Sequence, residues 1–162
     1  FGVGGAEVQS YFYAKEFASQ GWKVYFLSKK YRNKNSNFED PRITPLLFNK
    51  NRISFLDHLA VIYLLIRHRP NYIFFRNNTY QLGIIALFKK IINSEMIWSI
   101  KSDLTCGKDA ATIRRRNKYA DNKVNMLQSM IFRMHDALFN YGVQKCKIIL
   151  AQNNDQVKKG KR

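Results

Sequence analysis

The sequence predicts an α/β fold in which helices cover both faces of an open parallel sheet. Short runs rich in β-branched and aromatic residues alternate with longer segments whose apolar residues recur every three or four positions. A glycine-rich run, Phe1 to Gly5, directly precedes the first of these helical segments. A glycine turn of this kind before a helix is typical of Rossmann-like sheets, which is the arrangement we expect.

Apolar residues spaced three and four positions apart from Val8 onward predict the first helix, and Gly21 is expected to end it. Residues 22–28 follow at once with the composition of a buried strand. Residues 43–47 are expected to form at best a short edge strand, because Pro45 cannot donate a hydrogen bond to a central ladder. Helix, glycine and strand at this spacing form half of an alternating α/β unit.

The middle of the chain continues the alternation. A helix with one broad apolar face is expected over residues 53–67, and Pro70 ends it. Residues 72–75 read as a strand buried on both faces, residues 80–92 as a helix and residues 96–100 as a further strand. This order favours parallel pairing of the strands.

The last third begins with a charged, irregular stretch that runs to about Asn125. A helix follows over residues 126–141, and we expect it to stop near Gly142. Residues 148–151 form a last strand, and residues 153–156 resemble the capped start of another helix. We expect one globular domain over residues 1–162 that is truncated at both ends. The strand that would precede the glycine run in such a fold is expected to be missing from the sequence.

The charge balance is strongly basic, with 28 Lys and Arg against 11 Asp and Glu. Such an excess attracts polyanions, so nucleic acid, anionic lipid and nucleotide diphosphates are candidate partners. The longest apolar run is too short to span a membrane. Cys106 and Cys146 have no second ligand at metal spacing, which favours a reduced intracellular protein without a metal site.

Ligands of open parallel sheets bind outside the carboxyl ends of the strands, so candidate residues are sought there. Those residues are Gly4, Gly5, Ser28, Lys29, Arg76, Asn77, Asn78, Lys101, Ser102, Asp103, Gln152 and Asn153. Backbone amides of the glycine turn can approach a phosphate, and Arg76 and Lys101 suit phosphate oxygens. Amides and hydroxyls suit sugar hydroxyls, which need both donors and acceptors.

Each candidate also has a plainer interpretation. Gly4 and Gly5 could serve only a tight turn with positive φ, and Arg76 could be a surface charge. Asp103 could cap a turn, and residues 152–156 could simply start a helix. The three histidines, at positions 58, 68 and 135, are interpreted as packed or exposed side chains rather than ligands. Aromatic residues at core spacing, among them Phe12, Phe17, Tyr63, Phe74, Phe75 and Phe88, need no ligand.

Two common families with a glycine-rich first turn fit poorly. A dinucleotide fingerprint needs a third glycine where the chain has Glu7, and an acidic ribose partner where it has Ser28 and Lys29. The missing acidic residue argues equally against a methyltransferase loop. What remains is phosphate contact by a glycine turn without a carboxylate at the following strand end.

Four segments in order resemble motifs of one family. Residues 4–7 with 21–24 are similar to a "GGAE…GHEV" opening, and residues 69–76 to a "kPDivy.R" strand. Residues 97–103 are similar to a "vyriaSD" strand, and residues 148–156 to an "iiaQt..Q" strand and turn. Together they resemble the amino-terminal lobe of the family 4 glycosyltransferases, which have the two-lobed GT-B fold.

The resemblance implies an enzyme that moves a sugar from a nucleotide-diphosphate sugar to a saccharide or lipid-linked acceptor, with retention and generally without a metal or other cofactor. It places such an enzyme in bacterial cell-surface polysaccharide synthesis. By matching position, Gly4 and Gly5 would face the donor diphosphate. Arg76, Asn77, Lys101, Ser102 and Asp103 would line the acceptor side of the cleft. No catalytic residue is assigned, and without its donor-binding carboxyl lobe the chain is expected to be inactive.

Many members of that family carry a histidine after the strand that corresponds to residues 96–100, where this chain has Lys101, Ser102 and Asp103. The polar stretch that follows contains Arg114, Arg115 and Arg116, which could hold a lipid diphosphate or an anionic membrane. The expected location is therefore cytoplasmic, either free or peripheral on the inner face of the plasma membrane. The alternatives are a basic nucleic-acid-binding α/β module, for which the sequence has no recognition motif, and a non-catalytic small-molecule-binding domain.

Overall fold

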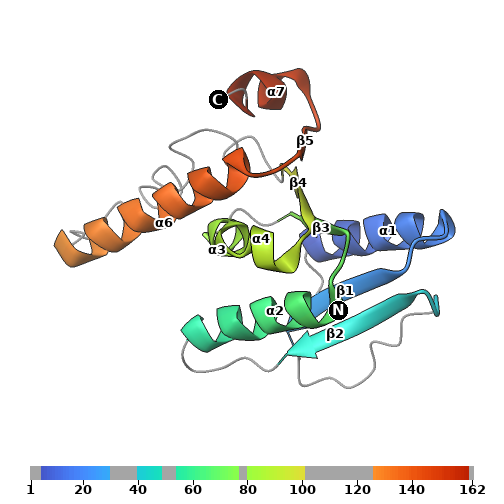
Figure 1. The fold of residues 1–162 in the computed structure, drawn as a ribbon. Helices are drawn as coiled ribbons and strands as arrows, with labels where there is room; N and C mark the ends of the chain where they lie inside the picture. The colour runs from blue at the N-terminus through green and yellow to red at the C-terminus, as the bar shows by residue number, and fades with distance from the viewer. Residues whose placement is uncertain (1–4, 30–39, 49–53, 77–79, 101–125, 161–162) are drawn as a thin grey trace. The chain divides into compact units, whose positions relative to one another are not determined.

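The computed structural model describes residues 5–29, 40–48, 54–76, 80–100 and 126–160 (Figure 1). Within these ranges the chain is an α/β protein with short sheets flanked by helices, and every described strand pair is parallel. The contacts divide the chain into two units, Phe1–Leu64 and Leu65–Arg162, and each is considered by itself. The predicted α/β class and parallel pairing are confirmed.

The first unit pairs one helix with a two-stranded sheet. Helix α1 (Gly5–Ser19) is followed by β1 (Val24–Lys29) and β2 (Ile43–Phe48), which run parallel in a register that sets Val24 opposite Ile43. The core between helix and sheet is formed by Ala14, Ala18 and Ile43. The two alanines lie four residues apart on one face of α1, and their small side chains allow the helix backbone to lie close to the strands.

Gly21 ends α1 as predicted, and the structure shows why glycine is needed. Its φ of 86° is left-handed. The N–H of Gly21 donates to the carbonyl of Ala18 at 3.0 Å, and the N–H of Trp22 donates to that of Phe17 at 3.1 Å. This pair of bonds is a Schellman motif, which satisfies carbonyls that the helix end would otherwise leave open.

Pro45 lies on the outer edge of β2. The N–H of Val24 donates to the carbonyl of Arg42 at 2.9 Å, and donors alternate sides along a strand. Arg42, Thr44 and Leu46 therefore face β1, and Pro45 faces away from it. The missing N–H of Pro45 therefore removes no hydrogen bond between β1 and β2. It does remove a donor from the other side of β2, which disfavours pairing with a further strand there. The predicted edge strand is confirmed.

Helix α2 (Ser54–His68) contains the boundary between the two units. It buries Asp57, His58 and Ile62 and ends before Pro70, as predicted. Arg69, the residue before that proline, has a φ of 42° and leads the chain out of the helix.

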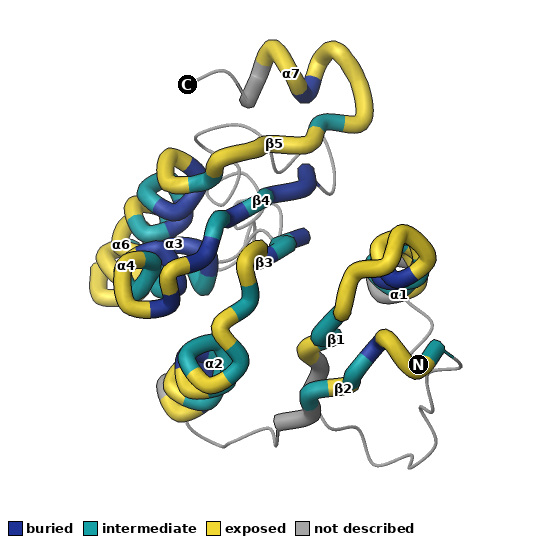
Figure 2. The backbone as a smooth tube through the Cα atoms, turned by 45° about the vertical axis from the view of Figure 1, so that its right-hand side comes forward, coloured by how far each residue is buried: buried dark blue, intermediate teal, exposed yellow. Residues whose placement is uncertain are grey.

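The second unit is built on the parallel sheet β3 (Tyr72–Phe75), β4 (Glu95–Ser99) and β5 (Ile148–Leu150), with β4 in the middle. Along the tube of Figure 2, β4 and the residue after it are mostly buried, whereas β5 is exposed. Met96, Trp98 and Ile100 lose all their accessible surface and form the centre of this core. The ring of Phe139, from a later helix, meets Trp98 edge to face at 5.4 Å.

The helix predicted over residues 80–92 is two helices, α3 (Gln81–Leu87) and α4 (Lys89–Ile92). The break is at Phe88, whose φ of −95° and ψ of 5° leave the helical region. Its N–H donates to the carbonyl of Ile85 at 3.0 Å, a bond three residues back rather than four. Apolar periodicity continues through this tighter turn, so the pattern does not reveal it.

Helix α6 (Met126–Gln144) ends two residues after Gly142, near which the sequence predicts a stop. The end of the helix is therefore predicted to within two residues, but Gly142 lies inside the helix and serves helix packing. A Cβ at Gly142 would lie 2.6 Å from the backbone nitrogen of Gly83 on α3, so the two helices touch backbone to backbone at this point. A glycine needed for close approach has the same sequence signature as a glycine that ends a helix.

Several residues expected in the core are exposed. Phe12 retains 64% of its accessible surface, because α1 packs through the face of Ala14 and Ala18. Tyr63 retains 59% of its accessible surface, and Tyr72 in β3 retains 45%. The prediction that β3 is buried on both faces is therefore wrong.

Across the described ranges, no helix combines the length and the apolar character needed to cross a bilayer.

Candidate functional site

The carboxyl ends of β3, β4 and β5 lie at one edge of the second unit's sheet, because the three strands are parallel. Arg76 directly follows β3 at this edge. Next to it along the sheet, the N–H of Ile100 donates to the carbonyl of Leu150 at 2.9 Å, which joins the ends of β4 and β5. Parallel sheets bind ligands at this edge, so it is the candidate site of the second unit.

Arg76 is only 7% exposed, and its Nε and Nη1 atoms are buried. The interpretation of Arg76 as a surface charge is therefore wrong. A guanidinium stays charged at any physiological pH, and burying a charge is costly unless anions or acceptors surround it. A buried arginine at a strand's carboxyl end is the kind of group that binds phosphate or carboxylate oxygens.

Gln152 and Asn153, which follow β5, belong to the start of helix α7 (Asn154–Gly160). The Asn153 Oδ1 accepts from the backbone N–H of Gln156 at 2.8 Å, and the Gln156 Oε1 accepts from the backbone N–H of Gln152 at 2.8 Å. These reciprocal bonds resemble a capping box, and the side chain of Gln156 is 1% exposed. The prediction that these residues start a helix is confirmed, and the side-chain amides of Asn153 and Gln156 are engaged in that role.

Helix α1 begins at Gly5, at the carboxyl end of the first unit's sheet. Tyr11 meets Phe26 at 6.5 Å between ring centres, while the turn after Ser19 leads directly into Val24, so the helix runs antiparallel to β1. Gly5 lies about 9 Å before Tyr11 along the helix axis, and Lys29 lies about 10 Å beyond Phe26 along the strand. The first turn of α1 and the end of β1 therefore reach the same edge.

The first turn of a helix presents N–H groups without intrahelical partners and carries positive partial charge. Gly5 has no side chain to shield its amide, and it is the first residue of α1. An anion could approach the backbone here more closely than at a residue with a Cβ.

Most of the remaining predicted site residues lie outside the described ranges. These are Gly4, Asn77, Asn78, Lys101, Ser102, Asp103, Arg114, Arg115 and Arg116. Ser28 and Lys29 are described as the last residues of β1.

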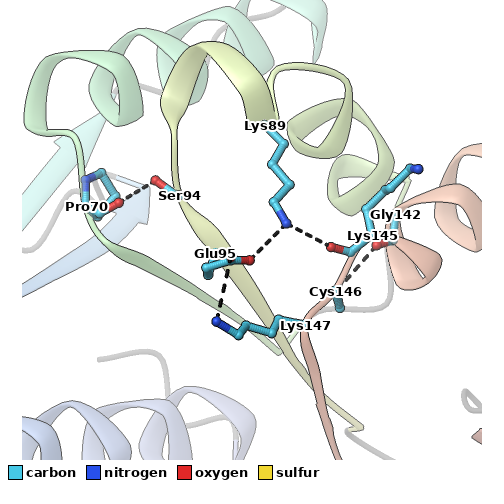
Figure 3. A network of polar contacts seen from close by, with 8 residues as sticks. All are labelled: Pro70, Lys89, Ser94, Glu95, Gly142, Lys145, Cys146 and Lys147. Atoms are coloured by element: carbon cyan, nitrogen blue, oxygen red, sulfur yellow. Dashed lines mark hydrogen bonds and ion pairs between the residues drawn. The ribbon is translucent and has the colours of Figure 1, made fainter.

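At the opposite edge of the second unit's sheet, Glu95 forms the centre of a polar network (Figure 3). Its carboxylate meets Lys89 Nζ at 2.9 Å and Lys147 Nζ at 3.8 Å. The hydrogen bond from Lys89 lowers the pKa of Glu95 below its usual value. Nearby, the Ser94 hydroxyl donates to the carbonyl of Pro70. Because this network lies at the amino end of β4, we assign it a structural role.

The same region holds Cys146, whose thiol donates to the carbonyl of Gly142 at 3.3 Å. Burial raises the pKa of Cys146 to about 11. The thiolate is the reactive form, so this cysteine is a poor nucleophile near neutral pH. Sequence reasoning did not identify the Glu95 network, because lysines are so frequent in this chain that a particular pairing has no signal.

The three histidines lie on helices of the described part, His58 and His68 on α2 and His135 on α6. His58 is buried in α2, and the ring of His135 stacks on Tyr80 at 3.9 Å between centres. Within the described ranges, no group of three or more His, Cys, Asp or Glu residues is placed to hold a metal ion.

Comparisons of the chain with protein-family models, with curated proteins and with solved structures found no match.

Proposed function

We propose that this chain forms the acceptor-side lobe of a retaining glycosyltransferase that uses a nucleotide-diphosphate sugar. The observation that carries the proposal is the start of α1 at Gly5, level with the carboxyl end of β1. This is where the four motifs of the sequence would require a diphosphate-binding turn. The buried Arg76 at the corresponding edge of the second unit supports the same kind of ligand.

The proposed chemistry is substitution at the anomeric carbon of the donor. The bond from that carbon to the diphosphate oxygen breaks, a bond to the acceptor oxygen forms, and the acceptor hydroxyl loses its proton. The diphosphate leaves with additional negative charge, so preorganised N–H groups such as that of Gly5 would lower the barrier without a metal. Donor and acceptor would also need to be held by the groups that the resemblance assigns to the cleft, including Arg76.

We also propose that the first unit's sheet belongs to a larger, Rossmann-like open parallel sheet. Pro45 blunts the outer edge of β2, so the sheet can extend only beyond β1. The amides of β1 that point away from β2 alternate with that of Val24, and Leu27 is among them. Helix α1 packs antiparallel on β1, as the helix of a β-α-β crossover does.

The test is a nucleotide-release assay on the protein expressed from its complete coding region, with a panel of nucleotide sugars. Two variants distinguish the role of the Gly5 N–H from the role of its missing side chain. Gly5→Pro removes the N–H, and proline is tolerated in the first turn of a helix. Gly5→Ala keeps the N–H and adds only a methyl group.

We expect Gly5→Pro to lower turnover by about 100-fold, the usual effect of losing one oxyanion donor. Gly5→Ala should retain most of the activity. Equal activity in both variants would contradict the proposed role of the amide. No nucleotide release from any donor, together with salt-sensitive binding to generic DNA, would favour the nucleic-acid alternative.

A further inference from the structure

Helix α6 carries a second apolar face in addition to the one that packs against the core. The packed face, in the carboxyl-terminal half, includes Phe139, Gly142 and Val143. The other face begins at the amino end of the helix and is exposed to solvent (Figure 2). Its members are Met126, Leu127, Met130, Ile131 and Met134, which we call the α6 stripe.

The α6 stripe is continuous along the helix. At about 100° per residue, its five side chains fall within an arc of about 140°. Met126 retains 91% of its accessible surface, Met130 retains 70% and Leu127 retains 67%. Soluble proteins rarely leave so many large apolar side chains together in water, and a patch of this kind marks an interaction surface.

We propose that the α6 stripe docks on the surface of an anionic lipid bilayer, lying in the interface with its methionines and leucine among the acyl chains. The apolar stripe supplies the insertion, and the net charge of +17 supplies the attraction to the lipid headgroups. The inference does not depend on sugar transfer, since it uses only the exposure of α6 and the charge of the chain.

The charge also argues against two other occupants of this face, a second copy of the chain and an acidic protein groove. Two copies of a chain with a net charge of +17 repel each other, which disfavours pairing stripe to stripe. The stripe itself contains no charged side chain, and Arg133 is exposed beside it on the same helix. An uncharged surface bordered by a cation suits an anionic headgroup region better than it suits an acidic protein groove.

The methionines of the chain provide a direct test without any substitution. The protein has four of them. Three lie in the α6 stripe, and the fourth, Met96, has no accessible surface and serves as an internal control. Dilute hydrogen peroxide converts exposed methionine to the sulfoxide, and peptide mass spectrometry reads the rate at each position.

Oxidation is measured in buffer, with vesicles of phosphatidylcholine alone, and with vesicles containing equal parts of phosphatidylcholine and phosphatidylglycerol. We expect the anionic vesicles to slow oxidation of Met126, Met130 and Met134 by about tenfold, with Met96 slow in every condition. Equal rates in all three conditions would overturn the proposal. Protection that appears without lipid and grows with protein concentration would also overturn it, and would assign the stripe to a second copy.

A pair of matched variants tests the same surface by vesicle flotation. Leu127→Gln with Met130→Gln removes two large apolar side chains from the α6 stripe. Leu87→Gln with Ile91→Gln removes two comparably exposed side chains from α3 and α4 of the same unit. We expect the first pair to lower the partition coefficient by about tenfold or more and the second to leave it unchanged. An equal loss in both pairs would contradict a specific role for α6.

Discussion

The contact between α3 and α6 yields the sharpest prediction about stability. A methyl group at Gly83 would lie 1.9 Å from the carbonyl oxygen of Leu138 and 2.4 Å from its carbonyl carbon. Ordinary contact begins near 3.4 Å, so Gly83→Ala requires the helices to separate by about 1.5 Å (3.4 − 1.9). The obstructing atoms belong to helix backbone, so no rotation of a side chain can relieve the clash.

The change in the free energy of unfolding of Gly83→Ala follows from two opposing effects. Overpacking a tight contact costs about 1–3 kcal/mol when side chains can adjust, and a backbone clash should reach or exceed the upper end of that range. Replacing a helical glycine by alanine returns about 1 kcal/mol. Moving α6 away also weakens the contact of Phe139 with Trp98. We therefore expect Gly83→Ala to lower the free energy of unfolding by at least about 2 kcal/mol.

The assay is urea unfolding followed by circular dichroism. Gly142→Ala adds a methyl group at the same contact between α3 and α6. The variant that combines Gly83→Ala with Gly142→Ala should therefore lose less free energy of unfolding than the sum of the two single variants, because one substitution already moves the helices apart. Gly21→Ala is a useful contrast, since no atom lies within 4 Å of the added methyl group and only the positive φ opposes it. A change of less than about 0.5 kcal/mol in Gly83→Ala would refute the close crossing.

Two further predictions concern the cap of α7 and the Glu95 network. Asn153→Ala should lower stability by about 1 kcal/mol through loss of the cap, whereas Asn154→Ala, one residue later, should change little; thermal unfolding of both variants makes the comparison. The pKa of Glu95 is lowered in the folded protein, so its stabilising effect is present above the unfolded pKa and is lost as pH falls through the folded value. Glu95→Gln should therefore be less stable than wild type at pH 7, and the difference in stability should vanish in strong acid. Urea unfolding of both proteins at the two pH values measures this difference. Urea midpoints that differ by the same amount at both pH values would contradict the prediction.

Local patterns predicted most elements well. Apolar periodicity and the position of Pro70 gave the end of α2, and the run Tyr72–Phe75 matches β3 as observed. These elements were accessible because periodicity, proline and glycine act within a few residues. The donor geometry of Pro45 likewise follows from the chemistry of one residue.

Tertiary contacts explain the failures. The sequence marks the end of α6 near Gly142 but does not reveal that this glycine lies at a helix crossing, which only the proximity of Gly83 shows. Phe12 has the spacing of a core residue, but α1 packs through its alanines instead. The burial of Arg76 could not be predicted for the same reason, since it depends on which elements surround the end of β3.

The most direct test of the central claim is an NMR titration of the chain with inorganic pyrophosphate, observed at backbone amides. If the glycine run binds a diphosphate, the amide signals of Gly5 and Ala6 will move with saturation, and the movement of the Ala6 signal will be lost in Gly5→Pro but kept in Gly5→Ala. If the Gly5 signal stays still while exposed lysines respond without saturation, the anion is held by surface charge alone and the sugar-transfer proposal fails.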